Sequence, residues 1–282
     1  KFVFSLLLLS YLFLPACSSI TFAFFGCSTY DRGAGYDCGG ARKLKVLDAD
    51  RDIKCTTSAY RAWLPFVILT IAVWPLGVPA TFAVLLWRQR NKINPPVEVD
   101  DVEDRADFHG FESEVSRYRV ARIQAKKIAI RRRETGLDAL QLLFAEFEPR
   151  CYLFVVFDCF RRIVLTSILT LFSEGEVSQV GFGICCSLFS YKVYARFQPY
   201  IDDEDDLLSG LATMQLVLHF IGAMLVYASE SSSEEQSTFN GVAFGVVLVI
   251  IFCMTLWTAA YIVLISALGA QQVQERARSL RR

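Results

Sequence analysis

The residues best suited to chemistry lie inside an apolar run, "YLFVVFDCFRRIVLTSILTLF", which extends from Tyr152 to Phe172. Near its middle the run carries Asp158, Arg161 and Arg162. Residues three and four apart share one face of a helix, so the carboxylate of Asp158 can pair with either guanidinium. Charged side chains at membrane depth are rare, and they are either paired or placed along a functional path. The run therefore predicts an intramembrane charge cluster.

Three interpretations of this cluster follow. It can be an internal ion pair that fixes the helix against its neighbours, or it can line a water-filled ion path and take part in gating. It can also sense voltage, but voltage sensors repeat arginine along several turns of a helix, and two adjacent arginines fit that pattern poorly. The first two interpretations stay open at the level of the sequence.

Three further polar residues, Gln179, Gln215 and His219, fall inside apolar segments. Gln215 and His219 are one turn apart and therefore share a helix face. Such side chains hydrogen-bond between packed membrane helices, or they line a cavity. The sequence carries no phosphate-binding loop, no HExxH pattern and no nucleophile elbow. Its two histidines and nine cysteines show no zinc spacing, so we expect no enzyme activity, no metal and no cofactor.

The elements that hold these residues are predicted to be membrane helices. Hydrophobic residues make up 54% of the chain and the mean hydropathy is +0.37. Charged residues are missing from 2–30, 62–87, 207–229 and 237–274. A bilayer core needs about 20 apolar residues per helix. We predict an all-α fold, a polytopic transmembrane helix bundle that forms a single membrane domain over 1–282, with six spans at about 2–26, 62–87, 152–172, 177–195, 207–228 and 239–268.

The beginning of the chain allows a second interpretation. "KFVFSLLLLSYLFLPACSS" resembles a signal peptide, but the uncharged run continues through "ITFAFFGC", which favours a spanning helix. The chain begins at Lys1, and its first methionine is Met214, which indicates a fragment of a longer protein.

The second predicted span contains helix-breaking residues. Pro75, Gly77 and Pro79 stand in "VWPLGVPATF". Each proline removes a backbone donor, so we expect the helix to kink or partly unwind there. A kink of this kind can be a hinge, an ion-facing turn or a packing feature.

The distribution of Lys and Arg predicts orientation. Thirteen of them lie in 88–151 and four in the tail 269–282, whereas the connections 173–176 and 229–238 have none. Both ends of this chain and the loop 88–151 are therefore predicted to be cytosolic, in a multi-pass protein of the plasma membrane. The loop 27–61 is predicted to be extracellular. It contains Cys27, Cys38 and Cys55, and an oxidising compartment would favour a disulfide, for which Cys27 with Cys55 is the preferred pair.

A basic helix is predicted at 117–133 within the cytosolic loop, where eight of 17 residues are Lys or Arg. It can bind anionic lipid headgroups, recruit a calmodulin-like partner, or simply be solvated. The residues predicted to contact the lipid surface are Arg122, Lys126, Lys127, Arg131, Arg132 and Arg133. The expected partners are the lipid bilayer, anionic lipids and a second copy of the chain in a homo-oligomer, and nucleic acid is not expected.

Several motifs together resemble a known family. These are "VWPLGVPATFAVLLWRQR", "LFAEFEPRCYLFVVFDCFRRIVLTSILTLF", "SQVGFG" and "YARFQPYIDDEDDLLSGLATMQL". Over almost the whole chain, this order resembles the multispanning TRP-like region, or TRP C-terminal domain, of large protist and algal surface proteins. The most specific positions are Pro149, Asp158, Arg161, Arg162, Gln179, Pro199, Tyr200 and Gln215. Similar proteins often have Glu where this chain has Asp158, which conserves the charge.

The resemblance implies a cation channel or a channel-like sensor. The connection between the fifth and sixth predicted spans is only about ten residues, too short for a re-entrant filter of the kind that channels use. An alternative is therefore a non-conducting receptor or anchor that carries an adhesive ectodomain, and a small-molecule transporter is a third interpretation.

Overall fold

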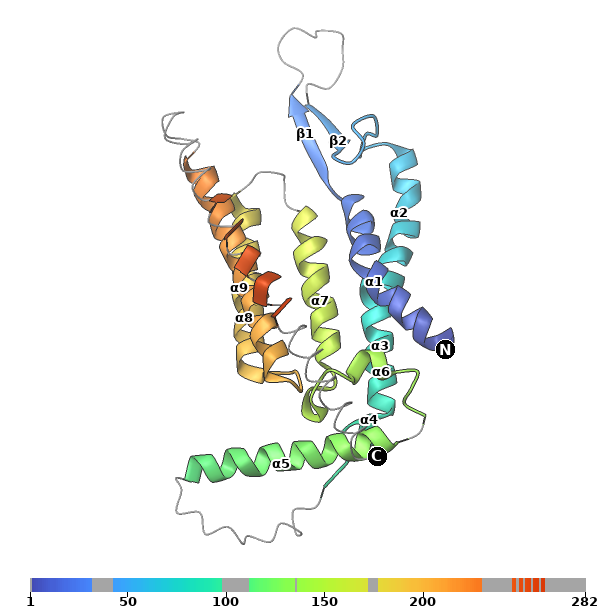
Figure 1. Ribbon diagram of the computed structural model, residues 1–282. Coiled ribbons are helices and arrows are strands. Elements are labelled where there is room, and N and C mark those ends of the chain that lie inside the picture. Colours follow the sequence, from blue (N-terminus) through green and yellow to red (C-terminus); the bar gives the residue numbers. More distant parts are fainter. Residues whose placement is uncertain are drawn as a thin grey trace, which may run out of the picture. The chain divides into compact units, whose positions relative to one another are not determined.

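The computed structural model describes residues 2–31, 43–97, 112–134, 136–171 and 177–229, together with short helical pieces between 245 and 261. These residues are mostly helical, and they form two compact units (Figure 1). The first unit comprises Lys1–Glu174 with Pro199–Ile201, and the second comprises Gly175–Gln198 with Asp202–Arg282.

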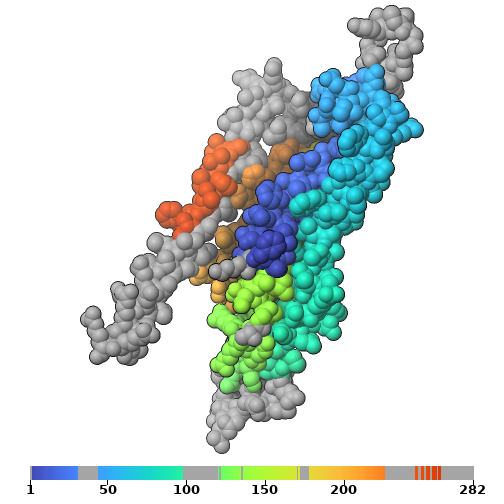
Figure 2. Space-filling view, turned by 90° about the vertical axis from the view of Figure 1, so that its right-hand side faces the viewer, coloured from blue at the N-terminus to red at the C-terminus, as the bar shows by residue number. Residues whose placement is uncertain are grey.

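The first unit is built around α1 (Phe2–Ala23), which packs against a long helical rod and against α7 (Phe154–Thr166). The rod consists of α2 (Ser58–Ile71), η1 (Ala72–Gly77) and α3 (Val78–Arg88). In Figure 2, α1 in dark blue lies along the rod in lighter blue and cyan. The core between these helices is apolar, and its most buried side chains are Leu14, Phe82, Leu86, Cys159 and Ile163.

The outer surfaces of α1 and the rod are also apolar. On α1 they include Leu6, Leu9 and Phe13, and on the rod they include Trp63, Phe66, Leu69, Leu76 and Trp87, each at least half exposed. A water-soluble domain rarely leaves such long apolar surfaces uncovered, whereas a bilayer would cover them. Three helical stretches among the described residues are long and apolar enough to cross a membrane: Phe2–Ala23, Ser58–Arg88 and Asp203–Leu225. The chain is therefore compatible with a membrane protein.

The six predicted spans correspond only in part to these three stretches. The predicted third span contains α7 of 13 residues, followed by the short η3 (Ile168–Leu171). The predicted fourth span coincides with α8 (Val177–Phe197), which is helical but less apolar. The predicted sixth span, 239–268, lies mostly outside the described residues. Six spans remain a prediction.

The proline-rich part of the rod is helical, and its form is a π-helix. Residues Ala72–Gly77 adopt this wider turn around Pro75, between α2 and α3. Proline lacks a backbone donor and its ring crowds the preceding turn, and a π turn can absorb both effects without ending the helix. A Cβ on Gly77 would come within 2.8 Å of the carbonyl oxygen of Ala72. The expected irregularity at Pro75 and Gly77 is thus a local π segment, whereas Pro79 lies in the first turn of the regular helix that follows.

A hairpin connects α1 to α2 at one end of the rod (Figure 1). It consists of β1 (Cys27–Asp31) and β2 (Lys43–Leu47), which are antiparallel with Cys27 opposite Leu47. Cys27 and Cys55 form a disulfide, as predicted, while Cys38 lies outside the described residues. The ring of Tyr60 stacks on Phe24 at 4.4 Å, and its hydroxyl donates to the Phe24 carbonyl oxygen at 2.8 Å. These contacts fix the end of α1 to the beginning of α2.

Among the described residues, three short elements and one long helix gather at the other end of the rod. They are α4 (Arg90–Ile93), α5 (Glu112–Arg133), α6 (Gln141–Phe144) and η2 (Pro149–Cys151), and Figure 1 shows α5 lying crosswise there. The segment after α6 pairs with 199–201: Glu148 donates its N–H to the Pro199 carbonyl at 2.8 Å, and Ile201 donates to Glu146 at 3.0 Å. The predicted helix 117–133 forms the greater part of α5.

The second unit contains α8 and α9 (Asp203–Ser229), which pack side by side. The helices approach closely at Gly183, where an added Cβ would lie 2.5 Å from the ring of Phe220. At Gly181, two residues earlier in α8, an added Cβ would meet nothing within 4 Å. A side chain at position 183 would therefore require Phe220 to move, whereas one at position 181 would not.

This difference predicts opposite effects of two alanine substitutions. Gly181→Ala is expected to stabilise slightly, since alanine is favoured over glycine in a helix by about 1 kcal/mol. Gly183→Ala forces Phe220 to move, and overpacking of this kind costs about 1–3 kcal/mol. Thermal unfolding of both variants in detergent should place Gly183→Ala below Gly181→Ala. Equal melting temperatures would contradict the close packing of α8 and α9.

Candidate functional site

The charge cluster predicted in the third apolar segment is present on α7. Asp158 is buried, with 6% of its surface exposed, and it accepts hydrogen bonds from both arginines. Arg161 donates from Nε at 3.0 Å and from Nη2 at 2.6 Å to Oδ1. Arg162 donates from Nε to Oδ2 at 2.8 Å. The i,i+3 and i,i+4 spacing thus produces both expected ion pairs on one carboxylate.

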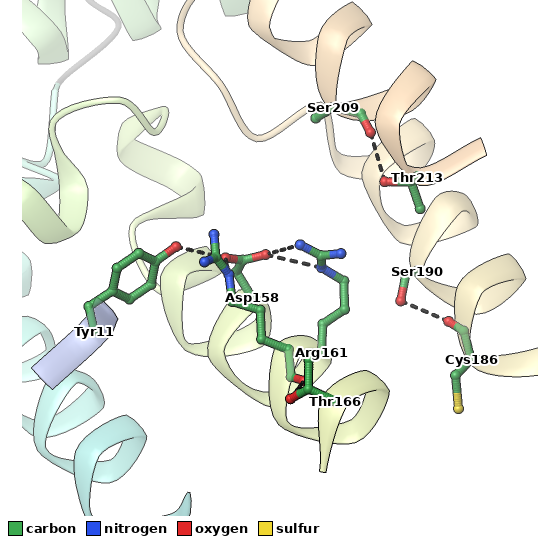
Figure 3. Close-up of polar contacts among 9 residues, drawn as sticks. Tyr11, Asp158, Arg161, Thr166, Cys186, Ser190, Ser209 and Thr213 are labelled. Carbon is green, nitrogen blue, oxygen red and sulfur yellow. Dashed lines mark hydrogen bonds and ion pairs between the residues drawn. The ribbon is translucent and has the colours of Figure 1, made fainter. Parts of the chain in front are cut away.

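A fourth contact to this carboxylate comes from α1. Tyr11 donates its hydroxyl to Oδ2 of Asp158 at 2.9 Å (Figure 3). The guanidinium carbon of Arg162 lies 4.7 Å from the centroid of the Tyr11 ring, a cation–π distance. Sequence reasoning missed Tyr11, because Tyr11 and Asp158 are 147 residues apart in the chain. The only sequence feature that marks Tyr11 is that it is a polar side chain within a long uncharged segment.

The depth of the cluster follows from Tyr11. α1 has 22 residues and carries no charge, and Tyr11 lies near its middle. At about 1.5 Å per residue, Tyr11 is roughly 14 Å from the start of a helix roughly 33 Å long. If α1 crosses a bilayer, the carboxylate and both guanidinium groups lie well inside the hydrocarbon region.

Hydroxyl groups extend this polar contact along α1 and α7. Ser19 donates to the carbonyl oxygen of Thr166 at 3.0 Å, and its Oγ lies 3.3 Å from that of Ser167. Ser167 is fully buried. Ser18 is also fully buried, and its Oγ has no hydrogen-bond partner among the described residues. The two helices are therefore joined by polar groups at two levels, as expected for helices that pack inside a membrane.

The other polar residues predicted at membrane depth lie on the second unit. Gln179 is half-buried on α8, and Gln215 is half-buried on α9. His219 is exposed, and its Nδ1 lies 2.8 Å from the backbone carbonyl oxygen of Gln215. This contact is local to α9. Two buried hydroxyls of this unit also bond within their own helices: Ser190 donates to the Cys186 carbonyl and Thr213 to the Ser209 carbonyl (Figure 3).

The basic residues of α5 divide into two faces. Arg122, Lys126, Arg132 and Arg133 are exposed. On the other face, Lys127 donates to Oδ1 of Asn94 at 2.8 Å and so ties α5 to the end of the rod.

The structure differs from the sequence-based expectation at Arg131. This residue is buried, with 5% exposed, and donates to the carbonyl oxygens of Phe147 at 3.0 Å and Ala145 at 3.4 Å. Its guanidinium also lies 5.2 Å from the ring of Phe144. Burial, and after it the charge of Arg132, lower the pKa of Arg131 from its usual value. Arg131 therefore fixes α5 in place and does not belong to the lipid-contact set.

The described residues contain no group of three or more His, Cys, Asp or Glu that could hold a metal ion. What the Asp158 cluster can do chemically is limited to ion pairing and hydrogen bonding, because its carboxylate is occupied by four donors.

Comparisons with protein-family models, with curated proteins and with solved structures find no match for this sequence. The TRP-like resemblance accordingly stays a prediction.

Proposed function

We propose that this chain is the multi-pass membrane domain of a TRP-like cation channel or channel-like sensor, with six spans in the plasma membrane. The observation that supports it is the buried carboxylate of Asp158, paired with the partly exposed Arg161 and Arg162 and held against the middle of α1. Ionisable groups at such a depth are expensive, and proteins retain them where helices must respond to ions, voltage or a ligand.

In this proposal the cluster acts as a latch between α1 and α7, not as a binding site for the permeant ion. A carboxylate offers about four lone-pair positions. The two arginines and Tyr11 already supply four hydrogen bonds to Asp158. A cation would therefore have to displace a guanidinium from Asp158. In this proposal the cluster has two arrangements, one in which the arginines are bonded to Asp158 and one in which they are released, and a stimulus interchanges them.

The orientation proposed for the domain agrees with the positions of its ends. The disulfide-containing hairpin precedes the rod, and α4 with α5 follows it, so they lie at opposite ends of Ser58–Arg88 (Figure 1). A rod that crosses the membrane would place the disulfide outside the cell and the basic α5 in the cytosol, as the positive-inside rule expects.

The test is single-channel recording of the full chain in planar bilayers, compared with an Arg161→Gln/Arg162→Gln variant that inserts normally. We expect a cation conductance whose ratio of open to closed states changes at least about tenfold in the variant. Tenfold corresponds to about 1.4 kcal/mol, less than the typical contribution of a hydrogen bond to a charged group. Arg61→Gln removes an exposed charge from the first turn of α2 and should leave gating unchanged.

A receptor or anchor is the second candidate, and the saturated carboxylate also favours it, because a fully bonded pair can be a permanent clamp. The exposed basic residues of α5 would then hold anionic headgroups or a cytosolic partner. No conductance over a range of ions, voltages and membrane tensions would support this candidate. A small-molecule transporter has no further support from the described residues.

A further inference from the structure

We propose that the exposed basic face of α5 is a docking surface for an acidic segment of a cytosolic protein. The basic face consists of Arg122, Lys126, Arg132 and Arg133, each of which is exposed. The sequence from 120 to 133 contains no Asp or Glu, so the helix does not neutralise this charge itself. None of the four forms an ion pair among the described residues. The inference rests on the proposed orientation of the domain, which places α5 in the cytosol.

Two basic residues on the other side of α5 hold the helix in place. Lys127 donates to Oδ1 of Asn94 at 2.8 Å, which ties α5 to the end of the rod. Arg131 is buried and donates to the carbonyl oxygen of Phe147 at 3.0 Å, which ties α5 to the segment that leads into α7. The basic face is therefore fixed relative to the first unit before any partner arrives, and a fixed surface lowers the entropy lost on binding.

Helix geometry shows which way the basic face points. At about 100° per residue, Arg122, Lys126 and Arg133 lie roughly 140–180° around the helix axis from Arg131. The Arg131 side of α5 contacts the segment with Phe144 and Phe147, and α5 lies crosswise at that end of the first unit (Figure 1). The three basic side chains therefore project away from the helices that are proposed to cross the membrane. In this orientation they face the cytosol, and the headgroups of the same bilayer lie on the other side of α5.

The side chains between these charges indicate the kind of partner. A calmodulin-like protein grips a helix by apolar anchors one turn apart. The exposed residues between Arg122 and Arg132 that carry no charge are Ala125 and Ala129, whereas Ile123, Ile128 and Ile130 are half-buried. The face therefore offers charge without apolar anchors. Carboxylates are its complement, because a guanidinium pairs with a carboxylate through two parallel N–H groups. An acidic peptide segment fits this surface better than an apolar one.

The experiment measures binding of a fluorescein-labelled oligoglutamate peptide to the full chain in phosphatidylcholine nanodiscs, by fluorescence polarisation. We expect Arg122→Gln/Lys126→Gln/Arg133→Gln to raise the apparent dissociation constant about tenfold at low salt, the combined order expected from three exposed charge pairs. High salt should weaken binding to the wild type and reduce this difference, because exposed charges are screened.

The matched control removes the same amount of charge from the other end of the rod. Arg51→Gln/Lys54→Gln/Arg61→Gln changes three exposed basic residues in and beside the beginning of α2. This variant should bind the peptide as the wild type does. An equal loss in both variants would mean that the peptide responds to net charge alone, and it would refute a docking surface on α5.

Other outcomes decide between occupants of the basic face. If the α5 variant, shown to be folded by its melting curve, binds the peptide as the wild type does, the docking surface is refuted. If that variant retains less phosphatidylserine on purification but binds the peptide unchanged, lipid headgroups are the partner and the acidic protein is not. If the peptide binds only after the acidic residues within 98–107 are changed to Asn and Gln, the chain itself supplies the occupant and the external partner is wrong.

The test is independent of the proposed conductance. Nanodiscs expose both faces of the protein to the peptide, so binding is measured whether or not the chain conducts ions. A silent channel that binds the peptide would overturn the proposed function and leave this inference standing. A conducting channel whose α5 variant binds the peptide as the wild type does would do the reverse.

Discussion

Asp158→Asn is expected to lower the free energy of unfolding by about 3 kcal/mol, because it removes the buried carboxylate to which two partly exposed guanidinium groups are paired. Asparagine has nearly the same shape, so the loss would come from charge and not from a cavity. Asp158 is the only carboxylate bonded to Arg161 and Arg162 among the described residues, and both ion pairs are lost together. Chemical or thermal unfolding in detergent micelles, followed by circular dichroism, measures the change.

Neutralising the arginines in the same background tests the physical reason. The triple variant Asp158→Asn/Arg161→Gln/Arg162→Gln removes all three charges of the cluster, so it should be more stable than Asp158→Asn alone. Tyr11→Phe removes one hydrogen bond and retains the ring, and it should cost only about 1 kcal/mol. An Asp158→Asn protein within about 0.5 kcal/mol of the wild type would be typical of a surface site, and it would contradict the buried cluster.

The sequence predicts the contacts of the cluster that lie within one helix, but not the contact that comes from another helix. The pairing of Asp158 with Arg161 and Arg162 depends on i,i+3 and i,i+4 geometry within one helix, which is a local property. The contact with Tyr11 depends on how α1 packs against α7, and no residue near Asp158 in sequence encodes it. The Cys27–Cys55 pair was predictable because few alternatives exist for three cysteines in one short loop.

Two other features were not accessible from composition. The run of basic residues on α5 predicts a charged helix, but it does not show that the Arg131 side chain is covered by the segment that contains Phe144 and Phe147. The proline positions in the rod predict an irregular helix, and the choice between a kink and a π turn depends on backbone geometry around Ala72 and Gly77. Both are properties of tertiary packing or backbone detail, which residue types alone leave undetermined.

A Cys27→Ser/Cys55→Ser variant is expected to lose roughly 3–4 kcal/mol of stability in the chain-entropy description of a loop of this length. The disulfide closes a separation of 28 residues that includes the whole β1–β2 hairpin. The Tyr60–Phe24 stack and the Tyr60 hydroxyl bond would remain, so α1 and α2 should stay joined while the hairpin loosens. Hydrogen exchange should therefore rise first in β1 and β2.

Reductant separates this effect from a general effect of cysteine removal. Reducing the wild type should reproduce the loss, reductant should not change the double variant, and Cys185→Ser should match the wild type because Cys185 is an exposed free cysteine. Disulfides persist in oxidising compartments, so the redox state of the pair in cells also reports which side of the membrane the hairpin faces. Trapping Cys27 and Cys55 as free thiols in intact cells would reverse the proposed orientation, and with it the cytosolic placement of α5.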